Sequence, residues 1–190
     1  MHLEAFRQYH CPDWNDFPDI ELYMDQVISV LERSLEPISW GDEKSITSAM
    51  INNYVKQKII PPPQNKRYAR SQLALLFMVC VWKKFMPLSE IALLLECLGK
   101  RGDEESYSLF ARELTGAMGS LFREEEPKPA PLSDPIENAV RAACTAFAAV
   151  TYSRIKLEEA AGEILPPKEP EKKEEKKEKK EKSKEKQEKK

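Results

Sequence analysis

Histidine and glycine are both scarce in this chain of 190 residues. The two histidines, His2 and His10, lie near the start, and only six glycines occur in the whole sequence. Acid–base catalysis most often uses a histidine or a paired carboxylate in an apolar cleft, and no such cluster is recognisable. Phosphate-binding loops and the dinucleotide fingerprint need closely spaced glycines, which are missing. We therefore expect a protein that is not an enzyme and that uses no cofactor.

Cysteines are few and far apart. The four are Cys11, Cys80, Cys97 and Cys144, and no CxxC or Cys/His pair has the spacing of metal ligands. His10 is adjacent to Cys11, but no second pair completes a site. We expect reduced thiols that pack as small apolar groups, and no metal site.

Long hydrophobic runs are also missing. The longest apolar run, LALLFMVCVW at 73–82, has ten residues, whereas about 18 or more are needed to span a membrane. The sequence MHLEAFRQYH at the start lacks the basic and apolar regions of a secretory signal peptide. We therefore predict a cytoplasmic protein with no membrane partner.

Acidic residues are absent from one long part of an otherwise acidic chain. The formal net charge is −2, yet residues 44–84 contain eight basic residues and no Asp or Glu. Residues 1–43 carry a net charge of −8, and residues 85–167 carry −6. A positive region concentrated between two acidic ones indicates a polyanionic partner more directly than the overall charge does.

The end of the chain has a different composition. From Lys168 to Lys190 there are 12 lysines and 8 glutamates, with no aliphatic or aromatic residue. Such a segment buries too little apolar surface to offset its ordering entropy. We predict an irregular segment over 1–18, a helical domain over 19–124, a linker over 125–132, a helix over 133–165 and a disordered tail over 166–190.

Apolar periodicity predicts a domain that is all-α or nearly so. Residues 71–85 are apolar on nearly every side and should form its buried centre, while Pro61, Pro62 and Pro63 end the preceding helix and lead into a short exposed loop or ribbon. Asp134 is expected to cap the start of the last helix, with Pro135 at its first position. The predicted helices span 20–36, 45–58, 71–85, 88–98, 104–122 and 134–160.

Polar side chains line one side of the predicted helix 45–58. Ser48, Asn52 and Lys56 recur at every fourth position, with no acid that would repel phosphate. Amide side chains can bond base edges in the major groove, whereas hydroxyl and ammonium groups can bond phosphate oxygens. Basic residues follow in the next loop. The candidate DNA-binding residues are Thr47, Ser48, Asn52, Asn53, Lys56, Lys66, Arg67, Tyr68 and Arg70.

The same residues allow a structural interpretation. The asparagines and cations can form a solvated face that has no ligand, and Tyr54 and Tyr68 fit core positions better than base-stacking ones. A basic helix can also dock an acidic partner, including the acidic segment 1–43 of its own chain. A protein–protein interaction module is therefore the alternative function to DNA binding.

Three parts of the sequence follow one another between residues 50 and 95: MINNYVKQKIIPPP, KRYARSQLALLFMVCVWKK and LSEIALLL. Their order resembles the start of MerR-type winged helix-turn-helix regulators, in which a recognition helix is followed by a turn with proline, a basic wing ending in Tyr, and a helix pair. More closely, MINNYVK and KRY resemble a bacterial family known as domain of unknown function 1836, over about residues 20–125. The resemblance implies a transcriptional regulator that inserts helix 45–58 into the major groove of double-stranded DNA and clamps the backbone with residues 66–70.

The chain departs from the MerR pattern in ways that bear on base contact. Ser48 follows Thr47 where MerR proteins usually have Arg, Lys58 replaces the glycine of the turn, and the wing is shorter. In MerR proteins a C-terminal helix pairs two subunits. The alanine-rich helix 134–160 can form such a homodimer, or it can fold back onto its own domain.

Overall fold

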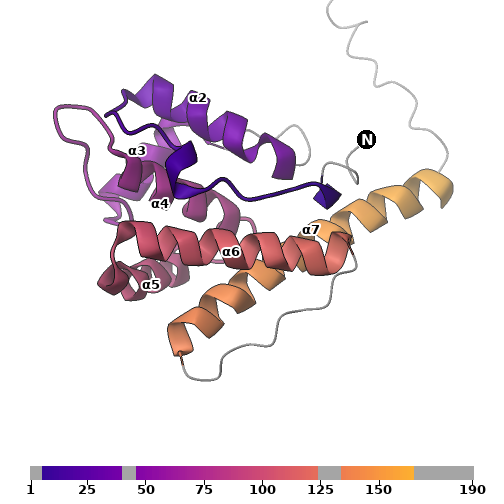
Figure 1. Cartoon of the computed structure of the whole chain (residues 1–190). Helices are drawn as coiled ribbons and strands as arrows, with labels where there is room; N and C mark the ends of the chain where they lie inside the picture. Colours follow the sequence, from indigo (N-terminus) through magenta and orange to yellow (C-terminus); the bar gives the residue numbers. More distant parts are fainter. Residues whose placement is uncertain (1–5, 40–45, 124–133, 165–190) are drawn as a thin grey trace, which may run out of the picture. The chain divides into compact units, whose positions relative to one another are not determined.

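The computed structural model describes residues 6–39, 46–123 and 134–164, and the predicted linker 125–132 and tail 166–190 lie outside these ranges. The described elements, labelled in Figure 1, are η1 (Trp14–Asp16), α2 (Met24–Leu35), η2 (Glu36–Ile38), α3 (Ser48–Lys56), α4 (Arg70–Trp82), α5 (Leu88–Leu98), η3 (Gly99–Arg101), α6 (Asp103–Phe122) and α7 (Pro135–Ile164). Within the described ranges, β pairing is limited to two isolated bridges. The predicted all-α class is therefore confirmed.

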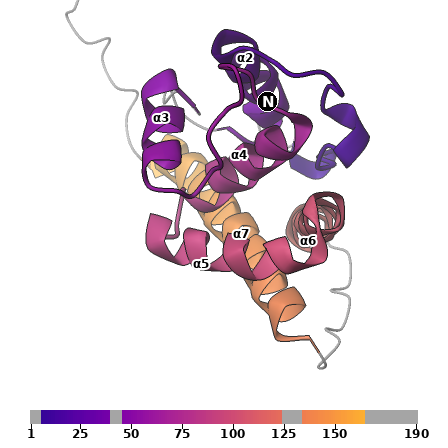
Figure 2. The same ribbon diagram turned by 90° about the vertical axis from the view of Figure 1, so that its left-hand side faces the viewer.

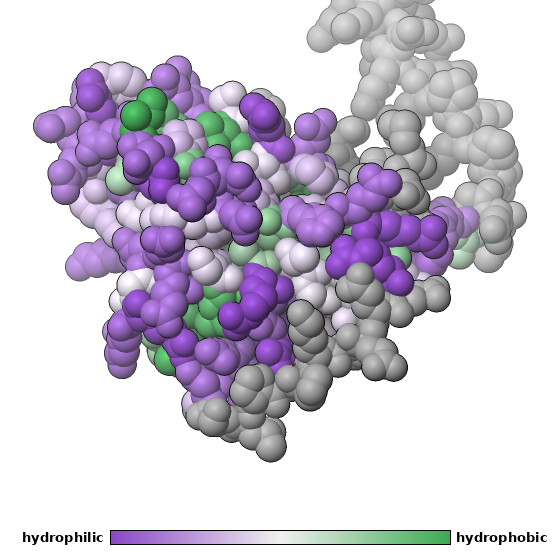
Figure 3. Space-filling model, viewed as in Figure 1, coloured by the Kyte–Doolittle hydropathy of each residue, from purple (hydrophilic) through white to green (hydrophobic). Residues whose placement is uncertain are grey.

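The chain divides into two compact units, residues 1–155 and 156–190, and the packing described below is that of the first. Figure 3 shows that hydrophilic groups cover most of one face of the molecule, with apolar groups in separate small patches. Among the described helices, none combines the length and the apolar character needed to cross a membrane.

Helix α4 is the buried centre of the first unit, as predicted from its apolar residues on every side. Between Gln72 and Trp82 its side chains are buried, except for the partly exposed Leu75. Helices α2, α5 and α6 each contact it, and Figures 1 and 2 show them arranged around it. The Trp82 ring meets Phe110 of α6 edge-on, with the centroids 5.2 Å apart. Three sides of α4 are thereby withdrawn from water, which is the main source of stability in such a domain.

The predicted thiols behave as apolar groups. Cys11, Cys80 and Cys144 are buried, and Cys97 is partly exposed. Burial raises the pKa of the Cys80 thiol to about 12, although Lys83 and Lys84 act in the opposite direction. The thiols in the core therefore remain protonated at neutral pH.

Helix α2 begins later than predicted. The helix was predicted over 20–36, but α2 starts at Met24 and Ile20 is 69% exposed. The reason is that residue 22 is extended and pairs with residue 68, so the chain cannot yet be helical there.

The first part of α7 folds back onto its own domain. Val140, Cys144 and Phe147 are fully buried in the common core. The predicted Asp cap is present, because Asp134 Oδ1 accepts the backbone N–H groups of the second and third helical residues at 2.8 and 3.3 Å. The alanines at 139, 142 and 149 stay exposed. A homodimer through this helix stays a prediction.

An ion pair joins α6 to α7. Glu113 is 8% exposed and accepts hydrogen bonds from Arg141 Nε at 2.6 Å and from Arg141 Nη2 at 3.2 Å. Burial raises the pKa of Glu113, but hydrogen bonds from Arg141 and Arg112 outweigh this effect, so the pKa lies below its ordinary value of 4.5. A carboxyl group with a lowered folded-state pKa stabilises the fold fully above its unfolded pKa, and this contribution is lost as the pH falls through the folded pKa.

We expect Glu113→Ala to lower the free energy of unfolding at neutral pH by about 2–3 kcal/mol, because Arg141 loses the carboxylate that it binds in a half-buried site. The difference from wild type should shrink as the pH falls below 4.5. Urea denaturation at a series of pH values measures both effects. Glu96→Ala, at an exposed position of α5, is the control and should change stability little; a pH-independent loss at position 113 would contradict the ionic role.

Candidate nucleic-acid interface

Helix α3 starts one residue after Thr47. The Thr47 hydroxyl accepts a hydrogen bond from the backbone N–H of Met50 at 3.3 Å, so Thr47 is the helix cap and its oxygen is already engaged. Ile51 and Tyr54 are buried and attach the helix to the core. The predicted polar face is exposed to solvent. Its members are Ser48, Asn52, Asn53, Lys56 and Gln57.

The end of α3 is a Schellman motif. The N–H of Ile59 donates to the Tyr54 carbonyl at 2.9 Å, and the N–H of Lys58 donates to the Val55 carbonyl at 3.0 Å. Lys58 takes a φ of 59°, the left-handed conformation that glycine usually provides at this position. A side chain there costs about 1 kcal/mol in backbone energy. The predicted helix 45–58 therefore ends two residues earlier, at Lys56, and the chain then reverses direction with Lys58 exposed.

The connection to α4 contains a tight hairpin turn. Gln64 and Arg67 exchange two backbone hydrogen bonds, of 3.0 and 2.8 Å. Between them, Asn65 and Lys66 have φ values of 48° and 64°, which is typical of a two-residue type I′ turn. The predicted short ribbon is present, and Lys66 occupies the central position where glycine is preferred. Figure 2 shows α3 and the connection between α3 and α4 together on one side of the domain.

One antiparallel bridge joins this turn to the segment before α2. The N–H and carbonyl groups of Leu22 and Tyr68 bond each other at 2.9 and 2.8 Å. Both side chains point into the core and are 5% and 2% exposed. Tyr68 was predicted as a DNA contact, and this placement is corrected, because a buried ring cannot reach a phosphate oxygen.

The neighbours of this bridge point outward, because side chains alternate along an extended chain. Arg67 Nη2 donates to the Tyr23 hydroxyl at 3.0 Å, and the guanidinium carbon lies 5.0 Å from the centre of the Tyr23 ring. The hydrogen bond to Tyr23 raises the pKa of Arg67. Tyr23 was not predicted as a site residue, because it lies outside the basic stretch of the sequence. The available signal was its position next to a buried residue in an extended segment, where the following side chain faces solvent.

Arg70 is held by the N-terminal segment. Its Nη1 donates to Asn15 Oδ1 at 3.1 Å, its Nη2 lies 3.4 Å from Asp19 Oδ1, and its guanidinium carbon lies 5.8 Å from the centre of the Trp14 ring. The side chain is 18% exposed. Arg70 was predicted to clamp the DNA backbone, but its charge is partly neutralised within the protein. The predicted residues that remain on the solvent-exposed surface are Ser48, Asn52, Asn53, Lys56, Lys66 and Arg67.

This surface lies within the part of the chain that matches a known family. The model of a family described as a domain of unknown function, DUF1836, matches residues 12–112, which is over half of the chain. The chain belongs to the DUF1836 family. Comparisons of this DUF1836 protein with curated proteins and with solved structures give no significant match. The family range includes the bridge, α3 and the hairpin turn, and excludes α7.

The left-handed conformation of Lys58 can be tested through stability. We expect Lys58→Gly to raise the free energy of unfolding by about 1 kcal/mol, because glycine adopts this φ without strain. The matched control is Lys56→Gly, two residues earlier at the last helical residue of α3, which should lower it by about 0.5 kcal/mol. Urea denaturation compares the two variants, and effects of the same sign would contradict the proposed end of α3.

Proposed function

We propose that this DUF1836 protein is a DNA-binding transcriptional regulator that places α3 in the major groove and the hairpin turn 64–67 on the phosphate backbone. The observation that carries the proposal is the pair of exposed lysines, Lys58 and Lys66, at left-handed positions. Glycine would avoid the backbone cost of about 1 kcal/mol at each site. Because lysine is retained at two strained positions near α3, we infer that the positive charges of these two side chains are needed for binding.

The electrostatics of the surface fit the same partner. Within residues 46–84 there is no acid, and Lys56, Lys58, Lys66 and Arg67 are all exposed. The amides on α3 are groups that can bond base edges, and the hydroxyl of Ser48 is one that can bond a phosphate. Several cations facing a phosphate backbone release counterions on binding, so the affinity should depend strongly on salt.

The order of elements supports a MerR-like interpretation. Helix α2, helix α3, the hairpin turn and helix α4 follow one another as the helices and wing do in a winged helix-turn-helix domain. The wing consists of a single two-residue turn, so it can contact only the phosphate backbone of DNA. Cytoplasmic localisation and a homodimer through α7 belong to the same proposal.

The double variant Lys56→Glu with Arg67→Glu should abolish DNA retention and leave the fold intact, because both side chains are exposed. Gel shift with pooled genomic fragments at moderate salt measures retention, and thermal melting checks the fold. Lys100→Glu with Arg154→Glu makes the same change of charge at exposed positions of η3 and α7 and should retain DNA. A double variant that still shifts DNA normally shows that the assigned surface is wrong.

The protein-interaction alternative gives a different result in the same experiment. It predicts no gel shift for the wild type and a partner whose capture resists nuclease treatment. The exposed basic face would then bind acidic side chains instead of phosphates.

Tyr23 should position Arg67 for phosphate contact. We expect Tyr23→Ala to weaken DNA binding three- to tenfold, about the value of one hydrogen bond with a cation–π contact. The loss should vanish when Arg67 is already alanine, because Tyr23 then has nothing to hold. Fluorescence anisotropy on the two single variants and the double variant measures this coupling, and additive losses would show that Tyr23 acts independently.

A further inference from the structure

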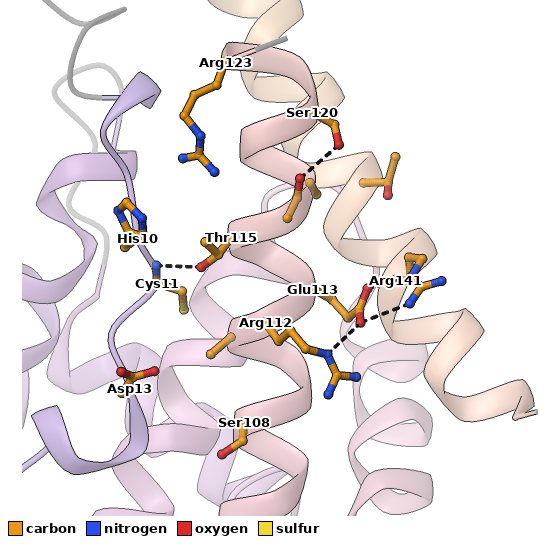
Figure 4. Close-up of a pocket in the computed structure, with 14 residues that line it drawn as sticks. His10, Cys11, Asp13, Ser108, Arg112, Glu113, Thr115, Ser120, Arg123 and Arg141 are labelled. Carbon is orange, nitrogen blue, oxygen red and sulfur yellow. Dashed lines mark hydrogen bonds and ion pairs between the residues drawn. The ribbon is translucent and has the colours of Figure 1, made fainter. Parts of the chain in front are cut away.

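A groove of about 500 Å³ follows the exposed side of α6 (Figure 4). Residues around Cys11 form one wall, the beginning of α7 contributes Arg141 and Thr145 to the other, and α6 forms the floor. The volume lies within the range of small-molecule sites in proteins. None of the residues considered for DNA binding lines this groove.

The floor of the groove contains a glycine that packing does not explain. Gly116 lies in the middle of α6, where glycine is less favourable than alanine by about 0.5–1 kcal/mol. A methyl group at this position would meet no atom within 4 Å, so the neighbouring residues do not require glycine. The absence of a side chain leaves the α6 backbone open to an occupant of the groove.

The polar groups of the groove suit an anion. Glu113 is already bonded to Arg141 and Arg112, so its charge is satisfied. Arg112 is 60% exposed and uses Nε for this contact at 3.2 Å. Its two terminal nitrogens have no partner among the described residues and can bind a carboxylate or phosphate as a fork. Ser108 and Thr145 add hydroxyl donors at the rim.

The overall charge of the lining points the same way. Three arginines line the groove against two carboxylates, so its formal charge is positive even with Glu113 paired to Arg141 and Arg112. We propose that the groove binds a small organic anion bearing carboxylate or phosphate groups, with Arg112 as its main charged contact and the α6 backbone at Gly116 as its floor.

The wall of the groove continues into the surface assigned to DNA. The backbone N–H of Cys11 donates to Thr115 Oγ1 at 3.0 Å, which attaches the segment to α6. Farther along the same segment, Asp19 contacts Arg70 and Tyr23 holds Arg67. An anion in the groove therefore acts on the segment that orients two of the basic side chains. This link rests on the proposed function, whereas the anion site does not.

Amide NMR titration of the full chain tests the site, with citrate and inorganic phosphate as probes at constant ionic strength. In the wild type we expect saturable shifts at the amides of Cys11, Thr115 and Gly116. Arg112→Gln and Gly116→Leu should weaken binding at least tenfold, and leucine at 116 favours the helix, so the fold is retained. Ala142→Leu places the same side chain at an exposed position of α7 outside the groove and should bind as the wild type does.

Shifts that do not saturate with either probe, or equal binding by all four proteins, would overturn the site. DNA affinity measured with and without citrate tests the link. It should change in the wild type and stay constant in Gly116→Leu. Groove shifts without a change in DNA affinity overturn the link alone, and groove shifts in a protein that binds no DNA contradict the proposed function while supporting the site.

Discussion

The position of the hairpin turn beside the segment before α2 depends on two backbone hydrogen bonds between Leu22 and Tyr68. They join the segment before α2 to the connection between α3 and α4, which are more than forty residues apart in the chain. Because both side chains of the bridge are buried, the alternation of the extended chain directs Tyr23 and Arg67 to solvent. The orientation of the exposed guanidinium group is thus set by the core below it.

The surface around α3 contains two local conflicts between sequence and conformation. Lys58 ends a Schellman motif and Lys66 occupies a type I′ turn, and both positions favour glycine. Natural sequences usually agree with their local structure, and exceptions concentrate where a residue has another task. Gly116 is the opposite case, because it is a glycine at a position inside a helix, where a residue with a side chain would make the helix more stable.

The fold could be predicted from the sequence where the signal was periodic and strong. The apolar run of α4, the Asp cap of α7 and the polar face of α3 follow from spacing alone, and the structure confirms them. The start of α2 could not be predicted, because Ile20 keeps the helical spacing while its neighbour Leu22 pairs with a distant residue. Long-range pairing leaves no local trace in such a short segment.

The candidate site could be predicted only in part, for a related reason. Charge and spacing identified the exposed cations, but the partners of Tyr68 and Arg70 come from the N-terminal segment. Sequence patterns describe the chemistry of a side chain, but they do not show which residues contact it in the folded chain. The groove on α6 was not predicted, because its walls come from three regions distant in sequence.

The limits of the family match and the limits of the packed core do not coincide. The match begins at residue 12 and ends at 112, inside α6. The Phe6 ring, however, stacks on Phe122 with the centroids 5.3 Å apart, and Phe147 of α7 is fully buried. A fragment cut at the family limits would split a helix and would lack these three aromatic side chains of the core. The cooperative folding unit of this protein is therefore wider than its evolutionary module.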